Sequence, residues 1–363
     1  MRKQVLVCLV LLCLFGCQQA GRGVLQINAA EDFGKTVKVN LSGTVGSLEY
    51  IQLETDSACI IGRNPEFYVT RKYVISIDGN RCLLFSRKDG RFVREVLHKG
   101  QDDTGYRSTL RGGNVALIEE TDELMLKGWK PNEIVIQSLD TEAKRTLFLH
   151  GETPTMAPLG ADAAVSASLI VLGNEPYSMY LYNQGEVTDS IANGQLFENP
   201  ENVVLIITND DYFYRHAGKT YYKNMTNDTL YHIDFQGKHP HAVFMLDGKG
   251  VSLEMRYKPD LFRDLQPLQV NRITEDSDAI FYLIRQGKET YPMLYNKASG
   301  KGFRLEGKGL TNDIDGKVDL FPSRITKDNE YIFVVDPTTL EDDELANLGI
   351  DAEDNPVIVI GKK

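Results

Sequence analysis

Short apolar runs, rather than helical periodicity, dominate the chain beyond residue 35. They are rich in Val, Ile, Leu, Tyr and Phe and are bounded by Gly, Asn and Asp, as in Tyr73–Ile77 and Phe92–Val96. Runs of this composition between turn residues predict β-strands. Further runs are Cys82–Phe85, Glu133–Ile136, Ser168–Leu172, Val203–Ile207 and Asp278–Ile284. Many short strands at such spacing predict an all-β sandwich, barrel or propeller.

One repeat favours the propeller among these architectures. The segment from Arg272 to Phe281 aligns with the segment from Arg324 to Phe333, 52 residues later, and Arg, Ile, Thr, Asp, Ile and Phe coincide. Units of about 40–50 residues with four strands each are typical of propeller blades. We therefore predict a six-bladed β-propeller of four-stranded antiparallel blades, formed as one domain by residues 36–363.

The two ends of this domain are expected to meet in one blade. The last apolar run, Pro356–Ile360, is too close to the C-terminus to form a blade of its own. Pairing with the early run Leu48–Leu53 would complete the last blade and close the ring, which leaves few exposed edges. Two short helical excursions are predicted, over Tyr257–Leu265 and Thr338–Gly349. In the second segment acids follow a Thr at the start and Gly ends the segment.

The first residues have the pattern of an export signal. Arg2 and Lys3 precede an apolar run from Val5 to Phe15, which is shorter than the roughly 20 apolar residues that span a membrane. Leu14–Cys17 resembles the lipobox of bacterial lipoproteins. The resemblance implies cleavage before Cys17 and acylation of its thiol. The alternatives are a plain signal peptide cut at another small residue and a buried helix.

Lipidation would divide the chain into a signal peptide over residues 1–16, a tether over 17–35 and the propeller. Membrane attachment would then be through the lipid anchor only, because several acyl chains hold a protein to a bilayer without a spanning helix. Acidic residues do not follow Cys17 directly, which favours the outer membrane and its periplasmic face. We expect a lipid-anchored protein of the bacterial cell envelope.

Composition excludes two further classes of protein. With 40 basic and 51 acidic residues the formal charge is −11, which argues against nucleic acid as a partner because such binding needs a basic surface. Hydrophobic residues at 42% and charged residues at 25% exclude wholesale disorder. Two cysteines remain in the expected propeller, Cys59 and Cys82. The envelope permits a disulfide between them, and two buried free thiols are the alternative.

Several segments together resemble the NHL-like six-bladed β-propeller lipoproteins of bacteria. Tyr73–Val93 resembles one blade of that type, and Lys99–Tyr106 resembles the loop that closes it. Asn227–Tyr231, Asn312–Gly316 and Asp354–Ile360 are similar to further motifs of the family. The resemblance implies the fold over nearly the whole chain after the signal. It implies little about function, because the family is largely uncharacterised.

Patterns typical of common catalytic or metal sites are absent from the sequence or incomplete. It contains no Gly-x-Ser-x-Gly, His-Glu-x-x-His or Cys-x-x-Cys. Asp313, Asp315 and Asp319 are weak candidates for a Ca²⁺ site, with a solvated loop between blades as the alternative. His232, His239 and His241 have the residue type of a zinc site, but ordinary core or surface imidazoles fit their spacing better. We expect no cofactor.

The repeated arginines are the main candidates for ligand binding. If Arg272 and Arg324 each open the innermost strand of a blade, both lie near the central channel, where two guanidinium groups can grip a carboxylate or a sulfated sugar. Alternatively, each Arg locks its own blade through turn carbonyls or through Asp276 and Asp328.

Three aromatic residues in loop-like stretches, Trp129, Tyr106 and Tyr177, are candidates for stacking on a sugar, with packing between blades as the alternative. These features lead to a first hypothesis, a monomeric, non-catalytic envelope propeller that binds or scaffolds a protein or glycan. The second hypothesis is an envelope hydrolase or lyase with a metal or carboxylate site in the channel. Convergent acids or histidines in the channel would favour the enzyme.

Overall fold

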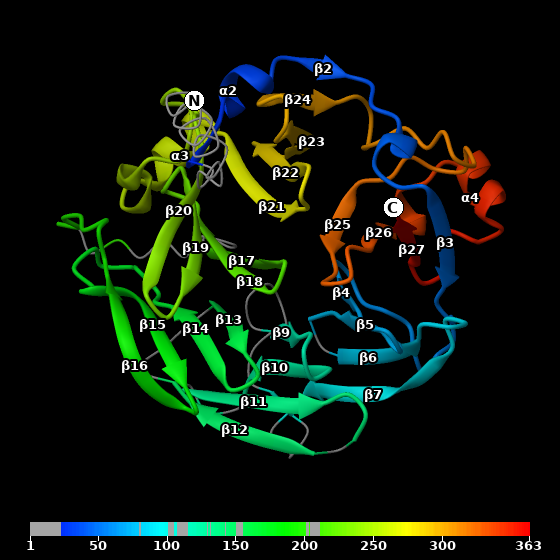
Figure 1. Cartoon of the computed structure of the whole chain (residues 1–363), viewed down its shortest axis with the longest axis horizontal. Helices are drawn as coiled ribbons and strands as arrows, with labels where there is room; N and C mark the ends of the chain where they lie inside the picture. Colours follow the sequence, from blue (N-terminus) through cyan, green and yellow to red (C-terminus); the bar gives the residue numbers. More distant parts are fainter. Residues whose placement is uncertain are drawn as a thin grey trace, which may run out of the picture.

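Six β-sheets form blades around a central axis in the computed structural model, which confirms the predicted six-bladed β-propeller (Figure 1). The structure describes residues 23–79, 81–100, 105–106, 115–128, 130, 132–141, 143–149, 155–200, 203 and 211–363. Within these ranges, no helix has both the length and the apolar character needed to cross a membrane.

Each blade is an antiparallel sheet whose first strand lies nearest the axis. The first blade contains β4 (Glu66–Val69), β5 (Tyr73–Ile77), β6 (Arg81–Ser86) and β7 (Phe92–Lys99), and the second contains β9 (Val115–Ile118), β10 (Glu123–Lys127), β11 (Glu133–Ser138) and β12 (Lys144–Phe148). The third contains β13 (Thr155–Gly160), β14 (Ala163–Ala167), β15 (Tyr177–Asn183) and β16 (Glu186–Ala192), and the fourth contains β17 (Asp211–His216), β18 (Lys219–Asn224), β19 (Thr229–Asp234) and β20 (Gly237–Phe244). The fifth contains β21 (Gln269–Glu275), β22 (Ala279–Gln286), β23 (Glu289–Asn296) and β24 (Lys301–Leu305).

The sixth blade closes the ring as predicted. It combines β25 (Pro322–Ile325), β26 (Tyr331–Val335) and β27 (Val357–Lys362) with the early strand β3 (Ser47–Gln52). β27 and β3 pair antiparallel, with Ile358 opposite Ile51. The two ends of the propeller are therefore joined by a ladder of backbone hydrogen bonds.

The N-terminal part of the fold starts earlier than predicted. β1 (Leu25–Ile27) adds in parallel to β20, and β2 (Thr36–Val37) adds in parallel to β24, with α2 (Ala29–Asp32) between them. A third short strand, β8 (Gly105–Tyr106), adds to β7. The assignment of residues 25–35 to a tether was therefore wrong, because these residues cover the outer edges of two blades.

Both helical excursions are present but shorter than predicted. α3 spans Pro259–Leu265 and is preceded by the 3-10 helix η2 (Leu253–Arg256). α4 spans Asp342–Leu348 and follows the 3-10 helix η3 (Pro337–Thr339); η1 (Leu41–Gly43) lies near the N-terminus. α4 begins late because Glu341 and Glu344 form its capping box, and it ends where Gly349 takes a φ of 69°.

One predicted strand, Ser168–Leu172, is displaced. The strand β14 ends at Ala167, and the following residues form a loop. The Glu175 carboxylate accepts hydrogen bonds from the backbone N–H groups of Val171, Leu172 and Gly173 at 2.7–2.8 Å. Because these donors are satisfied by a side chain, the segment needs no neighbouring strand. The predicted strand Val203–Ile207 lies outside the described residues except for Val203.

Within the described residues, a small hydrophobic cluster of Met225, Val251 and Met255 packs against α3, and six larger clusters each lie between two neighbouring blades. One of the six joins the fifth and sixth blades around Phe281, Tyr331 and Phe333, and the other five have the same arrangement. Each blade thus buries both faces, which a single sheet cannot do alone.

Cys59 and Cys82 are both buried, and neither forms a disulfide. Of the two alternatives for these cysteines, the structure therefore has two buried free thiols.

Candidate functional site

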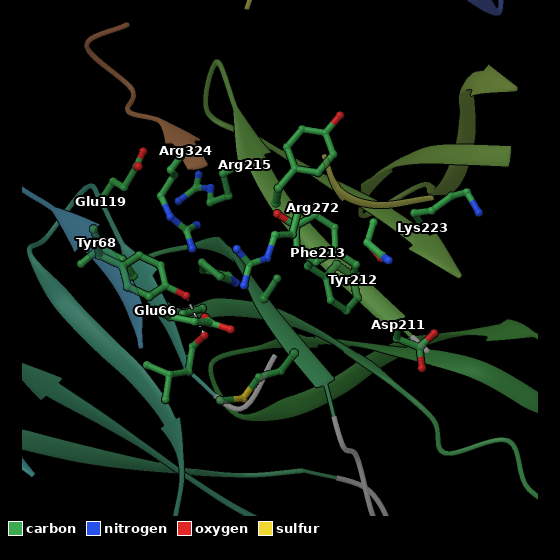
Figure 2. Close-up of a pocket in the computed structure, with 18 of the residues that line it drawn as sticks. Glu66, Tyr68, Glu119, Asp211, Tyr212, Phe213, Arg215, Lys223, Arg272 and Arg324 are labelled. Atoms are coloured by element: carbon green, nitrogen blue, oxygen red, sulfur yellow. Dashed lines mark hydrogen bonds between the residues drawn. The ribbon is translucent and has the colours of Figure 1, made fainter. Parts of the chain in front are cut away.

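A cavity of about 120 Å³ lies at the centre of the ring, at the end where the innermost strands begin. Figure 2 shows the side chains around it. The described residues that line it are Glu66, Tyr68, Val115, Ala116, Leu117, Glu119, Met156, Ala157, Pro158, Asp211, Tyr212, Phe213, Tyr214, Arg215, Lys223, Met225, Val270, Asn271, Arg272 and Arg324. The cavity therefore brings together residues from all six blades.

Arg324 on β25 is held in place without a carboxylate partner among the described residues. Its guanidinium lies over the ring of Tyr68, 3.9 Å from the centroid, and its Nε donates to the carbonyl oxygen of Phe67 at 3.2 Å. Tyr68 is itself fixed, since its hydroxyl donates to the carbonyl oxygen of Val115 at 3.0 Å. Burial opposes the charge of Arg324, but interactions with Tyr68 and nearby acidic groups raise its pKa overall. The group is therefore a preoriented cation.

Arg272 on β21 enters the same cavity through a strained backbone. Its φ is 44°, in the left-handed region that residues with a Cβ rarely adopt, and the register of β21 shifts between Asn271 and Thr274. The side chain is exposed, and within the described chain it has no hydrogen bond or ion pair. Figure 2 shows its guanidinium pointing toward the same part of the cavity as that of Arg324. Strain of this kind is concentrated at functional sites.

The two arginines do not lock their own blades through the repeated aspartates. Asp276 instead accepts a hydrogen bond from Tyr331 and pairs with Lys363 at 2.6 Å. Asp328 pairs with Arg71 at 3.1 Å. The structure therefore places both predicted arginines in one cavity. The backbone carbonyl that Arg324 binds, that of Phe67, lies on β4 of the neighbouring first blade and not in a turn of its own blade.

The other charged groups of the cavity interact with several different partners. Arg215 is engaged by Glu120 through two hydrogen bonds of 2.8 and 2.7 Å. Burial raises the pKa of Glu119 on the second blade. Asp211 on the fourth blade accepts hydrogen bonds from Tyr222 and, at 2.9 Å, from Asn224. In the part of the chain that the structure describes, no three His, Cys, Asp or Glu residues are grouped so that they could hold a metal ion.

The three aspartates considered for Ca²⁺ each accept hydrogen bonds from other groups of the protein. Asp313 accepts from the backbone N–H of Ser42 at 2.9 Å, and Asp319 accepts from that of Asn312 at 3.1 Å. Asp315 accepts from the side chain of Asn312 at 2.6 Å and from Tyr50 at 3.2 Å. These contacts connect the loop to the sixth blade and η1, which agrees with the alternative of a structural loop.

The three histidines divide into two groups. His232 and His239 lie opposite each other on β19 and β20, and His239 Nε2 is 2.9 Å from Asp234 Oδ1. His241 instead lies 3.0 Å from a carboxylate oxygen of Glu275 on the next blade. They therefore do not form one three-ligand site.

The aromatic candidates have no described place in the cavity. Tyr177 is exposed on β15 and packs against Tyr180, with ring centroids 5.8 Å apart. Trp129 lies outside the described residues, and so do the side chain of Tyr106 and Cys17. The cavity instead contains Tyr68 and two neighbouring residues of β17, Tyr212 and Phe213, none of which the sequence analysis selected.

A signal for Tyr68 was present in the repeat. Thr70 follows it by two residues, as Thr274 follows Arg272 and Thr326 follows Arg324. Aligning the early blade on this threonine would have placed the tyrosine at the arginine position. No comparable signal marked Tyr212 and Phe213, because their blade lacks the repeated motif.

Comparison with solved structures supports the fold. The chain is similar to the "Putative exported protein" of Bacteroides fragilis, with a TM-score of 0.69 and 15% identity over 94% of this chain and 100% of that one. It is less similar to a structural genomics protein of unknown function from Bacteroides thetaiotaomicron, with a TM-score of 0.45 and 14% identity over 87% and 76% of the two chains. At these identities the likeness concerns the fold alone.

Sequence comparison identifies a family but no activity. No curated protein matches the chain. The family model described as a domain of unknown function, DUF4934, matches residues 24–362, which is almost the whole described propeller. The chain therefore belongs to the DUF4934 family.

Proposed function

We propose that this protein is a lipid-anchored propeller of the bacterial cell envelope that binds an acidic glycan in its central cavity. The observation that carries the proposal is the pair Arg272 and Arg324 in one cavity. Neither guanidinium has a carboxylate partner among the described residues, although the protein as a whole carries an excess of acids. A cation without a partner in an acidic protein is available for an anionic ligand.

The geometry of the cavity suits a carboxylate or a sulfate on a sugar. Guanidinium groups bind planar oxyanions through two parallel hydrogen bonds. Arg324 is fixed by Tyr68, and the backbone strain at Arg272 positions the second cation beside it. Tyr212 and Phe213 supply apolar rings in the same cavity, which suits the apolar face of a sugar ring.

The expected location rests on the N-terminal sequence. Arg2 and Lys3, the short apolar run to Phe15 and the lipobox-like Leu14–Cys17 support export and acylation at Cys17. The exported assignment of the similar Bacteroides fragilis protein is compatible with that expectation. We also propose that the blades are of the NHL-like type. The anchored protein is proposed to lie on the outer membrane and to face the periplasm. Acyl-specific labelling of the protein, with Cys17→Ser as the comparison, tests the anchor directly.

Binding is tested by titration calorimetry of the purified protein. The probes are glucuronate, unsulfated chondroitin oligosaccharides, their sulfated forms and neutral cello-oligosaccharides. We expect the acidic probes to bind and the neutral ones not to bind. The paired substitution Arg272→Ala with Arg324→Ala should lower affinity at least tenfold, whereas Arg285→Ala, an exposed arginine on β22, should not.

The same protein is submitted to metal analysis and to an activity screen on these glycans. Binding of acidic glycans that is unaffected by the double substitution would overturn the assignment of the site. Stoichiometric metal together with glycan cleavage would favour the hydrolase or lyase instead. If no glycan binds, a protein partner becomes the better hypothesis.

A further inference from the structure

The inner end of the central cavity is crossed by side chains from several blades. The innermost strands begin around the cavity and run to the opposite face of the ring. The turns that follow them there are residues 70–72, 119–122, 161–162, 217–218, 276–278 and 326–330, all of which the structure describes. Across this end lies a group of residues that we call the floor, which consists of Leu117, Glu119, Glu120, Arg215 and Lys327.

An ion pair between two blades that are not neighbours forms the first part of the floor. Arg215 lies on β17 of the fourth blade, and Glu120 follows β9 of the second blade. The Arg215 guanidinium donates two hydrogen bonds to the Glu120 carboxylate, at 2.8 and 2.7 Å. A link between these blades passes in front of the third blade, so it lies across the channel. Paired hydrogen bonds of this kind also fix the direction of the guanidinium.

A second link reaches the same place from another direction. Lys327 follows β25 of the sixth blade, and its ammonium group donates to the backbone carbonyl oxygen of Glu119. This link joins the sixth blade to the second and passes in front of the first. Two links from opposite sides of the ring therefore meet at neighbouring residues of the second blade, Glu119 and Glu120.

A separate cavity lies beyond the floor. It has a volume of about 200 Å³, and its lining residues are Val69, Thr70, Arg71, Arg87, Leu117, Glu119, Glu120, Asp122, Thr326, Lys327, Asp328 and Glu330. Only Leu117 and Glu119 line both this cavity and the central cavity. Arg215 faces the central side and its partner Glu120 faces the other side. The floor therefore separates two cavities that would otherwise form one channel through the ring.

The size of the central cavity limits what it can hold. Its volume is about 120 Å³. A water molecule needs about 10–15 Å³ of such space, so the cavity has room for about ten waters. One sugar unit has a comparable number of non-hydrogen atoms. The cavity thus suits one sugar unit, which enters and leaves at the end where the innermost strands begin.

We propose that the central cavity recognises the terminal acidic sugar of a glycan chain and not an acidic sugar inside the chain. A terminal unit continues into the chain on one side only, which agrees with a cavity that has one mouth. An internal unit continues on both sides, and the floor blocks one of these paths. This inference rests on the proposed function and deepens it, because it specifies which unit of the glycan is bound.

The first test compares two chondroitin oligosaccharides that differ only at one end. The unsulfated hexasaccharide alternates glucuronate with N-acetylgalactosamine and has glucuronate at its non-reducing end. Removal of that terminal sugar with a β-glucuronidase gives a pentasaccharide whose two glucuronates are both internal. In titration calorimetry with the purified protein, we expect the hexasaccharide to bind at least as tightly as glucuronate and the pentasaccharide to bind at least tenfold more weakly.

The second test is the stoichiometry of binding to longer chains. Terminal recognition predicts one protein per chain, whatever the length of the chondroitin. Recognition of internal units predicts that the number of proteins per chain rises with length. Both tests use the unaltered protein, so they give a result even where a variant does not fold.

Removal of the floor tests its role directly. Arg215→Ala combined with Glu120→Ala removes both partners of the ion pair, so that neither charge is left unpaired. The preference for the hexasaccharide should then fall below threefold, because the chain can continue into the second cavity. The matched control is Arg71→Ala with Asp328→Ala, which removes a 3.1 Å ion pair at the same end of the ring but outside the central cavity. This control should keep the tenfold preference, and melting temperatures show that both variants are folded.

The outcomes separate this inference from the proposed function. If both oligosaccharides bind equally and the substitution of Arg272 and Arg324 still weakens them, terminal recognition is wrong and the proposed function remains. A stoichiometry that rises with chain length has the same meaning. A tenfold preference that survives in the folded Arg215 and Glu120 variant also overturns the inference, because the floor is then not its cause. If no acidic probe binds, the proposed function itself fails.

Discussion

The two ends of the repeated segment differ in how their charges are used. The first residue of each copy, Arg272 or Arg324, enters the central cavity, and the described structure gives it no anionic partner. The acids that follow in the middle of the copies are all paired. Glu275 is bound by Lys297 at 2.6 Å, and Glu330 is bound by Arg87 at 2.7 Å.

The most buried of these acids shows the difference most clearly. The side chain of Glu275 is fully buried, and it lies 3.0 Å from His241 and accepts from the Tyr214 hydroxyl at 2.9 Å. Although burial acts in the opposite direction, hydrogen bonds and charges from His241 and Lys297 lower the pKa of Glu275 to about 2.

One motif therefore serves two purposes. Its acids form ion pairs, within the fifth blade for Glu275 and Lys297 and between the sixth and first blades for Glu330 and Arg87, and its arginines leave cations open to the cavity. A charge that is buried and paired supports the fold only while both partners are present. A charge without a partner contributes little to stability and is free to bind a ligand. Substitutions at the two ends should accordingly have opposite consequences.

The largest effect is expected for Lys297→Met at the paired end. Removal of the lysine leaves Glu275 buried with one cation fewer, so the free energy of unfolding should fall by about 3–5 kcal/mol. Chemical denaturation measures this loss. Lys301→Met on β24 is the matched control, since its side chain is exposed. A loss below 1 kcal/mol would show that the ion pair is not what stabilises this end.

The next effect concerns pH. The pKa of Glu275 is lower in the folded protein, about 2 against an ordinary 4.5. The carboxylate therefore contributes stability above about pH 4.5, and this contribution is lost as pH falls toward 2. The contribution amounts to about 3 kcal/mol. The stability difference between the wild type and Glu275→Gln should shrink over that interval, and a constant difference would contradict the assignment.

A smaller loss is expected for Lys363→Met. Lys363 pairs with Asp276 and Asp278 at 2.6 Å each, but its own side chain is 40% exposed. Solvent screening limits such a pair to about 1 kcal/mol of unfolding free energy. Thermal unfolding of this variant, beside Lys301→Met, should show a shift in melting temperature smaller than that of Lys297→Met. An equal shift would mean that exposure does not weaken this pair.

The smallest and opposite effect is expected for Arg272→Gly at the open end. Glycine adopts a φ of 44° without strain, while its flexibility in the unfolded chain offsets part of the gain. The free energy of unfolding should rise by about 0.5 kcal/mol, and affinity for acidic glycans should fall. A clear loss of stability would show that Arg272 supports the fold rather than a ligand.

The sequence alone was sufficient for the architecture. The separation of 52 residues between Arg272 and Arg324 predicted the blade, and the position of Pro356–Ile360 predicted ring closure with the run at Leu48–Leu53. Both succeed because a blade is a local unit. Its strands follow one another along the chain, and their apolar pattern repeats wherever a neighbouring blade must be covered.

Where a local sequence pattern allows more than one structure, only the tertiary structure decided which one forms. The apolar run Ser168–Leu172 became a loop because the Glu175 carboxylate satisfies its N–H groups, and residues 25–35 joined the fold because β20 and β24 offered open edges. The central cavity depends on contacts between blades that are distant in sequence. Residues such as Tyr68 and Phe213 acquire their surroundings only when the ring closes, and no local pattern records that.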